Sequence, residues 1–288
     1  MNGASRVAAA FLIVSAGAFV AGCGGGGARC PTVRHASADA LFDNHVSARA
    51  HVTTLRAEAR VEQWGKKGRV RGTVLMMVAR PDRVRFDAVT QFGPVLTLTS
   101  DGDTFSLTDL ENRRFLTGPT CPVNIERLIG IPLEGAEVVR LLFADVPNVA
   151  PGMPVECTDE GRYRVVVPSS AGATAYEFEV PAADRDLAPD AQRSRLVRVV
   201  HRDASGALLW RATLSDYQSV TVRGAASSSS PSPVTKFQMP FDVRIEHPSR
   251  HADTQLKFQK VDAGLALPAD AFSQSAPPGM VAEQAPCE

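Results

Sequence analysis

The sequence predicts a mainly β fold of the α+β class, in which short helices cover the apolar face of an antiparallel sheet. Apolar and polar side chains alternate from Leu55 onward, which is the pattern of strands with one buried face. Turn sequences, rather than long crossover segments, separate these stretches, so strands that are neighbours in sequence should pair antiparallel. A helix is expected before the first strand, with Ser37 as its N-cap and an end near Ala50.

The first half of the sheet is predicted to be a series of hairpins. Residues 65–68 and 80–82 have the glycine, proline and charged residues that are typical of turns. The strands around them are expected over residues 55–62, 70–78, 84–88, 96–98, 105–107 and 113–117.

Two short apolar helices are expected to interrupt the strands, over residues 124–129 and 134–143, with a break at Pro132. A sheet with one apolar face must cover that face, and these helices are suitable covers. A polar stretch near 223–235, rich in serine and proline, is predicted to be a disordered loop. The β pattern around it predicts a hairpin over 155–167 and strands over 176–180, 196–201, 207–222, 241–246 and 254–261.

The N-terminus has the pattern of a bacterial lipoprotein signal peptide over residues 1–22. Arg6 supplies a positive charge before the apolar run 7–20, which is shorter than the about 20 residues that span a bilayer. Residues 20–23 resemble a lipobox, in which two small residues precede a cysteine that carries lipid. We therefore expect cleavage before Cys23 and lipid attachment to its thiol.

The glycine run that follows Cys23 predicts a flexible tether over residues 23–36, and the rest of the chain, 37–288, is expected to form one folded domain. Gly24 stands where an aspartate would favour retention at the inner membrane. The sequence therefore favours the periplasmic face of the outer membrane.

The other four cysteines are even in number, as expected for disulfides in an oxidising compartment. Three pairings are compatible with four cysteines. The favoured pairing joins Cys30 to Cys287, near the two ends, and Cys121 to Cys157. The alternative is four buried free thiols. The formal net charge of zero argues against nucleic acid as a partner.

Short motifs in the same order as in a known family add a resemblance. The chain resembles the LolB-like outer-membrane lipoprotein receptors of the LolA/LolB-like superfamily over about residues 37–147 and 237–280. The segment 148–236 is long for that family. The motifs are Gly68-Arg69-Val70-Arg71-Gly72, Arg83-Val84-Arg85-Phe86, Gln91-Phe92-Gly93, Asp101-Gly102, Gly118, Leu128-Ile129-Gly130-Ile131-Pro132, Met239-Pro240, Leu267-Pro268-Ala269-Asp270-Ala271-Phe272 and Pro277-Pro278-Gly279.

The resemblance implies a curved antiparallel sheet that forms an incomplete barrel, with helices over its concave face. Family members hold lipoprotein acyl chains in that concavity and pass them to the outer membrane. The partners that the resemblance implies are these acyl chains or a periplasmic lipoprotein carrier. A monomer is expected. The residues expected to line such an acyl cavity are Val74, Met76, Val84, Phe86, Leu96, Leu98, Phe105, Leu128, Ile129, Val138 and Leu142. The alternative is a packed core of sheet and helices that has no cavity.

The resemblance also points to Phe92 and Gly93, between two predicted strands, as a loop that contacts the membrane. Gln91 stands where the family usually has proline, and Pro94 follows the glycine, so the loop shape departs from the family pattern. The alternative is a Phe92 side chain that tucks under the edge of the sheet.

Motifs for catalysis and metal binding are missing from the sequence. It has no Gly-x-Ser-x-Gly elbow, no phosphate-binding loop and no Cys-x-x-Cys pair. We therefore expect a non-enzymatic protein without a metal or other cofactor. Two function classes stay open: a carrier or receptor for lipoprotein acyl chains, and an envelope scaffold or sensor lipoprotein that reuses the same fold.

Overall fold

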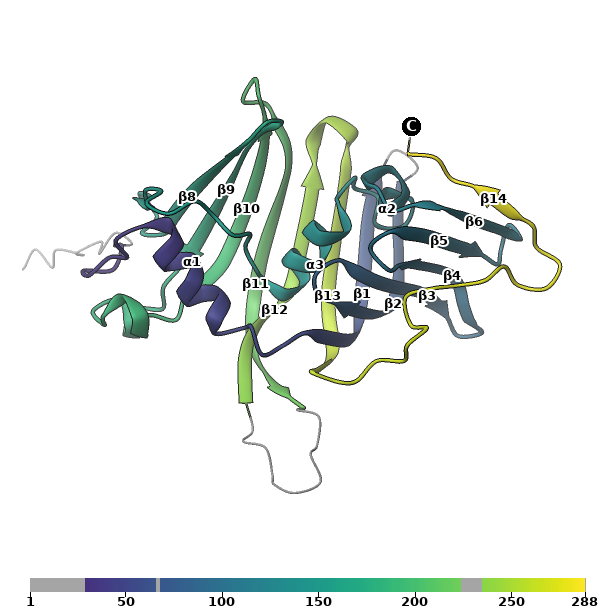
Figure 1. Ribbon diagram of the computed structural model, residues 1–288, viewed down its shortest axis with the longest axis horizontal. Coiled ribbons are helices and arrows are strands. Elements are labelled where there is room, and N and C mark those ends of the chain that lie inside the picture. The colour runs from purple at the N-terminus through teal and green to yellow at the C-terminus, as the bar shows by residue number, and fades with distance from the viewer. Residues whose placement is uncertain (1–28, 66–67, 224–234, 288) are drawn as a thin grey trace, which may run out of the picture.

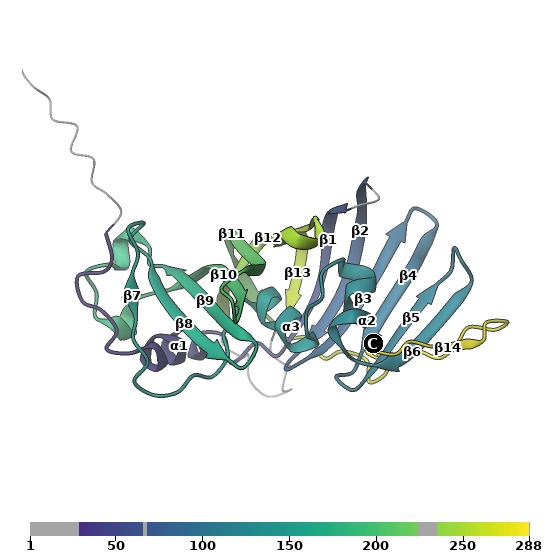
Figure 2. The same cartoon turned by 90° about the horizontal axis from the view of Figure 1, so that it is seen from above.

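The computed structural model describes residues 29–65, 68–223 and 235–287, and in them fourteen strands form one sheet. The sheet curves and stays open between its edge strands β7 and β14 (Figures 1 and 2). The predicted fold class and the incomplete barrel are therefore confirmed. The signal peptide, Cys23 and nearly all of the predicted loop near 223–235 lie outside the described residues.

The first half of the sheet consists of consecutive antiparallel hairpins, as the alternation predicts. Its strands are β1 (Thr54–Gly65), β2 (Gly68–Ala79), β3 (Arg83–Thr90), β4 (Gly93–Ser100), β5 (Thr104–Asp109) and β6 (Arg114–Pro119). In the β1–β2 register Ala59 lies opposite Val74. Both side chains are buried, so the apolar positions of the pattern form the inner face.

The second half continues the sheet through β13, which pairs antiparallel with β1. Its strands are β7 (Glu156–Cys157), β8 (Tyr163–Ser169), β9 (Gly172–Glu179), β10 (Arg195–Asp203), β11 (Leu208–Val222), β12 (Thr235–His247) and β13 (Ala252–Ala263). The last strand in sequence, β14 (Ala282–Gln284), belongs to the first half. The sequence did not predict β14, which pairs parallel to β6 at the edge of the first half. A strand of three residues has too few positions to show an alternating pattern.

In the described ranges three α-helices lie over the sheet, namely α1 (Ala38–Ser47), α2 (Pro122–Ile129) and α3 (Gly135–Phe143). Short 3-10 turns connect strands at η1 (Ala182–Asp184), η2 (Pro189–Ala191) and η3 (Pro248–Arg250). Helix α1 covers the β8–β10 half, and α2 and α3 cover the middle of the sheet (Figure 1). The Phe42 ring of α1 lies 5.5 Å from the rings of Tyr176 and Phe178 on β9. All three predicted helices are confirmed. None of the helices in the described ranges is both long and apolar enough to cross a membrane.

The predicted disulfide pairing is wrong. The structure joins Cys30 to Cys157 and Cys121 to Cys287, each with a Cα–Cα distance of 6.1 Å. The reason is the strand order, since Cys157 ends the edge strand β7, whereas Cys287 follows β14 at the opposite edge. A disulfide needs Cα atoms within about 7 Å, so Cys30 and Cys287 cannot meet.

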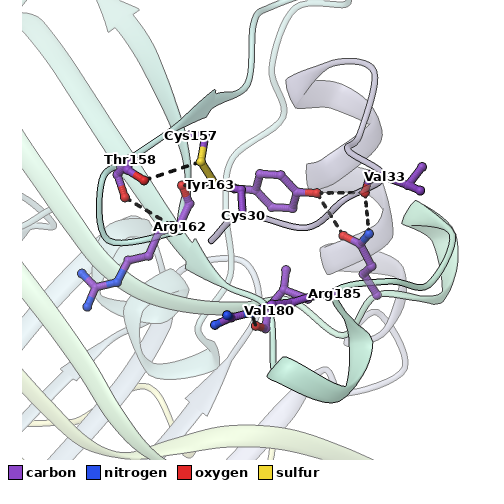
Figure 3. The surroundings of a disulfide bond; sticks show 9 residues. Cys30, Val33, Cys157, Thr158, Arg162, Tyr163, Val180 and Arg185 are labelled. Carbon is purple, nitrogen blue, oxygen red and sulfur yellow. Dashed lines mark hydrogen bonds between the residues drawn. A yellow bond between two sulfur atoms is a disulfide. The ribbon is translucent and has the colours of Figure 1, made fainter. Parts of the chain in front are cut away.

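The predicted tether over 23–36 is too long, because the structure binds its last part to the sheet domain. Cys30 is held by its disulfide, the Thr32 amide donates to the Arg185 carbonyl at 3.0 Å, and the Gln192 side-chain amide donates to the Val33 carbonyl at 2.7 Å. Figure 3 shows the surroundings of the Cys30–Cys157 disulfide, where the Tyr163 hydroxyl points toward the Val33 carbonyl. The segment from Cys30 onward is therefore part of the folded domain.

Candidate functional site

An apolar pocket of about 330 Å³ lies between the first half of the sheet and helices α2 and α3. Aliphatic side chains from six strands and both helices form most of its wall, and helix α3 packs against β3 and β12 at its side. The lining residues are Val61, Gln63, Val70, Arg71, Gly72, Thr73, Val74, Phe86, Ala88, Val89, Thr90, Val95, Leu96, Arg127, Ile129, Val138, Leu141, Leu142, Ile245, Thr254 and Leu256.

The structure separates the predicted cavity residues into two groups. Six of them line the pocket, namely Val74, Phe86, Leu96, Ile129, Val138 and Leu142. Four others, Met76, Val84, Leu98 and Phe105, are buried in the core beneath it, and Leu128 lies in α2. Alternation identifies the inner face of a strand, but it does not show where the covering helices leave space.

Gly72 and Val61 are lining residues that the sequence pattern placed on inner faces but that were not chosen as cavity residues. A Cβ atom added at Gly72 would meet no atom within 4 Å. The missing side chain therefore keeps part of the pocket open.

Polar contacts at its C-terminal end hold α2 over the pocket. The Thr254 hydroxyl donates to the Ile129 carbonyl at 2.8 Å, and Arg250 of η3 forms an ion pair with Glu126. Gly130, with a φ of 74°, ends the helix where the Gln63 side chain leaves no room for a Cβ atom. The helix is thus fixed to the sheet at one end, while its apolar residue Ile129 faces the pocket.

The β3–β4 hairpin presents Phe92 to solvent. Its side chain is 91% exposed, which contradicts the alternative that it tucks under the sheet edge. The Thr90 hydroxyl accepts the Phe92 amide at 3.2 Å, and Gly93 has a φ of 113°, a conformation that favours glycine. Val70, 62% exposed, lies near the tip of the neighbouring β1–β2 hairpin, at the same end of these strands. These hairpin tips therefore carry two exposed apolar side chains near the pocket.

The charge distribution gives no indication of a metal centre. In the described ranges, no three histidine, cysteine or acidic side chains come close enough to hold a metal ion.

The best-buried histidine, His45, joins α1 to the end of α3, because its Nε2 donates to the Ala144 carbonyl at 2.7 Å. Burial, together with the charge of Arg49, holds the pKa of His45 well below its usual value, so the ring is neutral at pH 7.

Comparisons with known proteins find the relationship in structure rather than in sequence. No protein-family model matches the sequence, and no curated protein matches it. A DUF1329 family protein from Desulfovibrio piger superposes with a TM-score of 0.53 at 9% identity, covering 82% of this chain and 97% of that protein. A LolA superfamily protein from Nitrosomonas europaea superposes with a TM-score of 0.53 at 9% identity, covering 83% of this chain and 99% of that protein. The chain therefore has the fold of a LolA superfamily protein.

Proposed function

We propose that this chain is a lipid-anchored, non-catalytic periplasmic protein that binds lipoprotein acyl chains in the apolar pocket and aids their delivery to the outer membrane. The observation that carries the proposal is the pocket itself, which lies between the sheet and α2 and α3 and has a mostly aliphatic wall. Its volume of about 330 Å³ is at the lower end of the range for ligand pockets, about 300–1,000 Å³. The shared fold with a LolA superfamily protein supports the same assignment.

The chemistry of the pocket wall favours a hydrocarbon ligand. Burying apolar surface stabilises a complex by about 0.8 kcal/mol for each CH2 group, without any directional contact. Polar lining residues already have partners in the protein: the Thr254 hydroxyl donates to the Ile129 carbonyl, Arg127 donates to Asn124, and Arg71 forms an ion pair with Glu62. The remaining wall therefore selects for apolar length rather than for a polar headgroup.

The membrane contacts in this proposal are the lipid on Cys23 and the loop at Phe92 and Gly93. An exposed phenylalanine loses unfavourable contact with water when it enters a lipid surface. Phe92 lies at the same end of strands β2 and β3 as the pocket-lining residues Val70 and Thr90. A monomer that receives its cargo from a periplasmic carrier could thus bring the pocket to the outer membrane.

Mass spectrometry of ligands extracted from the complete chain, purified from bacterial envelopes, tests this function. The expected result is co-purified fatty acid or acylated lipoprotein, at a level that falls when the pocket is filled by substitution. A preparation free of lipid that holds a stable protein partner would instead support a scaffold or sensor lipoprotein on the same fold.

A further inference from the structure

A second pocket, of about 400 Å³, lies beside α1, in the other half of the sheet from the apolar pocket. The end of α1, the segment around η2 and strands β11 and β12 form its wall. Cationic side chains dominate the charged part of this wall, because Asp190 is its one acidic residue in the described ranges. The cationic lining residues are Arg49, Arg193, Arg195 and Lys236.

Arg49 is the buried member of this set, with 3% of its surface exposed. Its Nη1 donates to the His45 carbonyl at 2.9 Å, but its Nε finds no hydrogen-bond partner in the part of the chain that the structure describes. Arginine stays protonated in proteins, so this side chain is a buried cation. A buried cation that lacks an ion-pair partner destabilises the fold, because it has lost its hydration.

The neighbouring groups do not neutralise Arg49. Asp145 already forms an ion pair with Arg80. His45 is uncharged, because its Nε2–H donates to the Ala144 carbonyl and its Nδ1 faces the Ser194 hydroxyl at 2.9 Å. Of the other cationic lining residues, Arg193 is neutralised by Asp184 at 2.7 Å. The pocket therefore keeps an excess of positive charge.

The rest of the sequence offers no nearby carboxylate. Residues 1–28, 66–67 and 224–234, which the structure does not describe, contain neither aspartate nor glutamate. The one acidic residue outside the described ranges, Glu288, follows Cys287, whose disulfide to Cys121 lies at the β6 end of the sheet. In the described ranges no carboxylate forms an ion pair with Arg49, and the attraction of Asp145 is shared with Arg80.

We propose that the pocket beside α1 binds a phosphate group, either free or in a lipid headgroup, with Arg49 as the buried cation that contacts it. Hydrogen bonds between a guanidinium and such an anion are charge-assisted and short, which makes them stronger than neutral ones. Arg195, half-buried against the Tyr217 ring, and Lys236, exposed on β12, add positive charge at the rim. This ligand differs in chemistry and in place from the hydrocarbon proposed for the pocket beneath α2 and α3.

Isothermal titration calorimetry on the complete chain in a non-ionic detergent tests the site, with inorganic phosphate and dihexanoyl phosphatidic acid as separate probes. Binding of either probe is expected to weaken at least about tenfold in Arg49→Met, since a hydrogen bond to a charged group contributes that much or more. Tighter binding of inorganic phosphate assigns a free anion as the ligand, and tighter binding of the lipid assigns a headgroup.

A second variant keeps the test valid if Arg49→Met does not fold. Lys236→Gln, at an exposed position, should weaken binding about two- to fivefold, as expected for a solvent-screened charge. Lys260→Gln, on exposed β13 surface outside this pocket, is the matched control and should leave the affinity unchanged. No binding of either probe to the wild type, or equal binding by the wild type and the Arg49 and Lys236 variants, would overturn the proposal.

Discussion

Gly72 lies directly opposite Val61 in the β1–β2 ladder, and both residues line the apolar pocket. A leucine at position 72 would extend into the open space, since a Cβ atom there meets nothing within 4 Å. We expect Gly72→Leu to fold with unchanged or slightly raised stability, because glycine weakens a strand interior. Its affinity for a fluorescent fatty acid should fall at least about tenfold, because the added side chain takes the place of about four buried carbons.

Gly65→Leu is the matched control for this experiment. Gly65 lies in the neighbouring strand β1, and a Cβ atom added to it also meets nothing within 4 Å, but it does not line the pocket. Its fatty-acid affinity should equal that of the wild type. Equal affinities for Gly72→Leu and Gly65→Leu would show that the acyl chain binds elsewhere.

Phe92→Glu should leave thermal stability almost unchanged, because exposed substitutions usually change the free energy of unfolding by less than about 0.5 kcal/mol. The added charge should nevertheless weaken contact with a lipid surface. Calorimetry would measure Tm, and transfer of a lipoprotein to liposomes would measure delivery. Val281→Glu, at a side chain 84% exposed in the C-terminal segment, provides the control. Equal delivery by both variants would remove Phe92 from the proposed membrane contact.

The sequence predicted what depends on local pattern. Apolar residues recur every two residues in β1–β4 and every three or four residues in α2 and α3. These elements could therefore be predicted without knowing the whole fold. The six predicted residues that line the apolar pocket, such as Val74 and Leu142, follow from the same patterns.

What could not be predicted depends on distant pairing. The partner of Cys30 is decided by which strand lies at the sheet edge, and that order is set by the β1–β13 pairing. Arg49 follows the end of α1, where a charged side chain is usually exposed to solvent, yet packing of α1 against the sheet buries it. The local sequence pattern predicts neither feature, because both depend on contacts between distant residues: His45 and Ala144 are 99 residues apart, and Cys30 and Cys157 are 127 residues apart.

The Cys121–Cys287 bond should stabilise the C-terminal segment that holds β14 beside β6. It closes a loop with a sequence separation of 166 residues, so the double variant Cys121→Ser, Cys287→Ser should lose about 2–4 kcal/mol of unfolding free energy. Urea unfolding measures the loss. Peptide mapping without reduction should recover the pairs Cys30–Cys157 and Cys121–Cys287. Recovery of a Cys30–Cys287 peptide would contradict the strand order.

Cys23→Ala should release the chain from membranes and leave the domain folded. The reason is that the described fold begins its contacts at Cys30, beyond the proposed lipid site. Membrane fractionation after carbonate washing would measure the release, and circular dichroism would show the fold. Cys30→Ala, which removes a disulfide but not the proposed lipid site, should remain bound to membranes. A Cys23→Ala protein that still carries lipid would contradict the anchor.

The neutral state of His45 predicts that the protein loses stability as the pH falls below about 6.5. Burial holds the folded-state pKa of His45 well below the unfolded value, so the unfolded chain takes up a proton first. The stabilisation is complete above about pH 6.5, and each pH unit below it costs up to about 1.4 kcal/mol. His35 and His247, whose pKa values burial also lowers, act in the same direction. His45→Gln, whose amide can still donate to the Ala144 carbonyl, should therefore show a smaller stability difference between pH 5.5 and 7.5 in urea unfolding. An identical pH dependence in the variant and the wild type would show that His45 is not a buried neutral histidine.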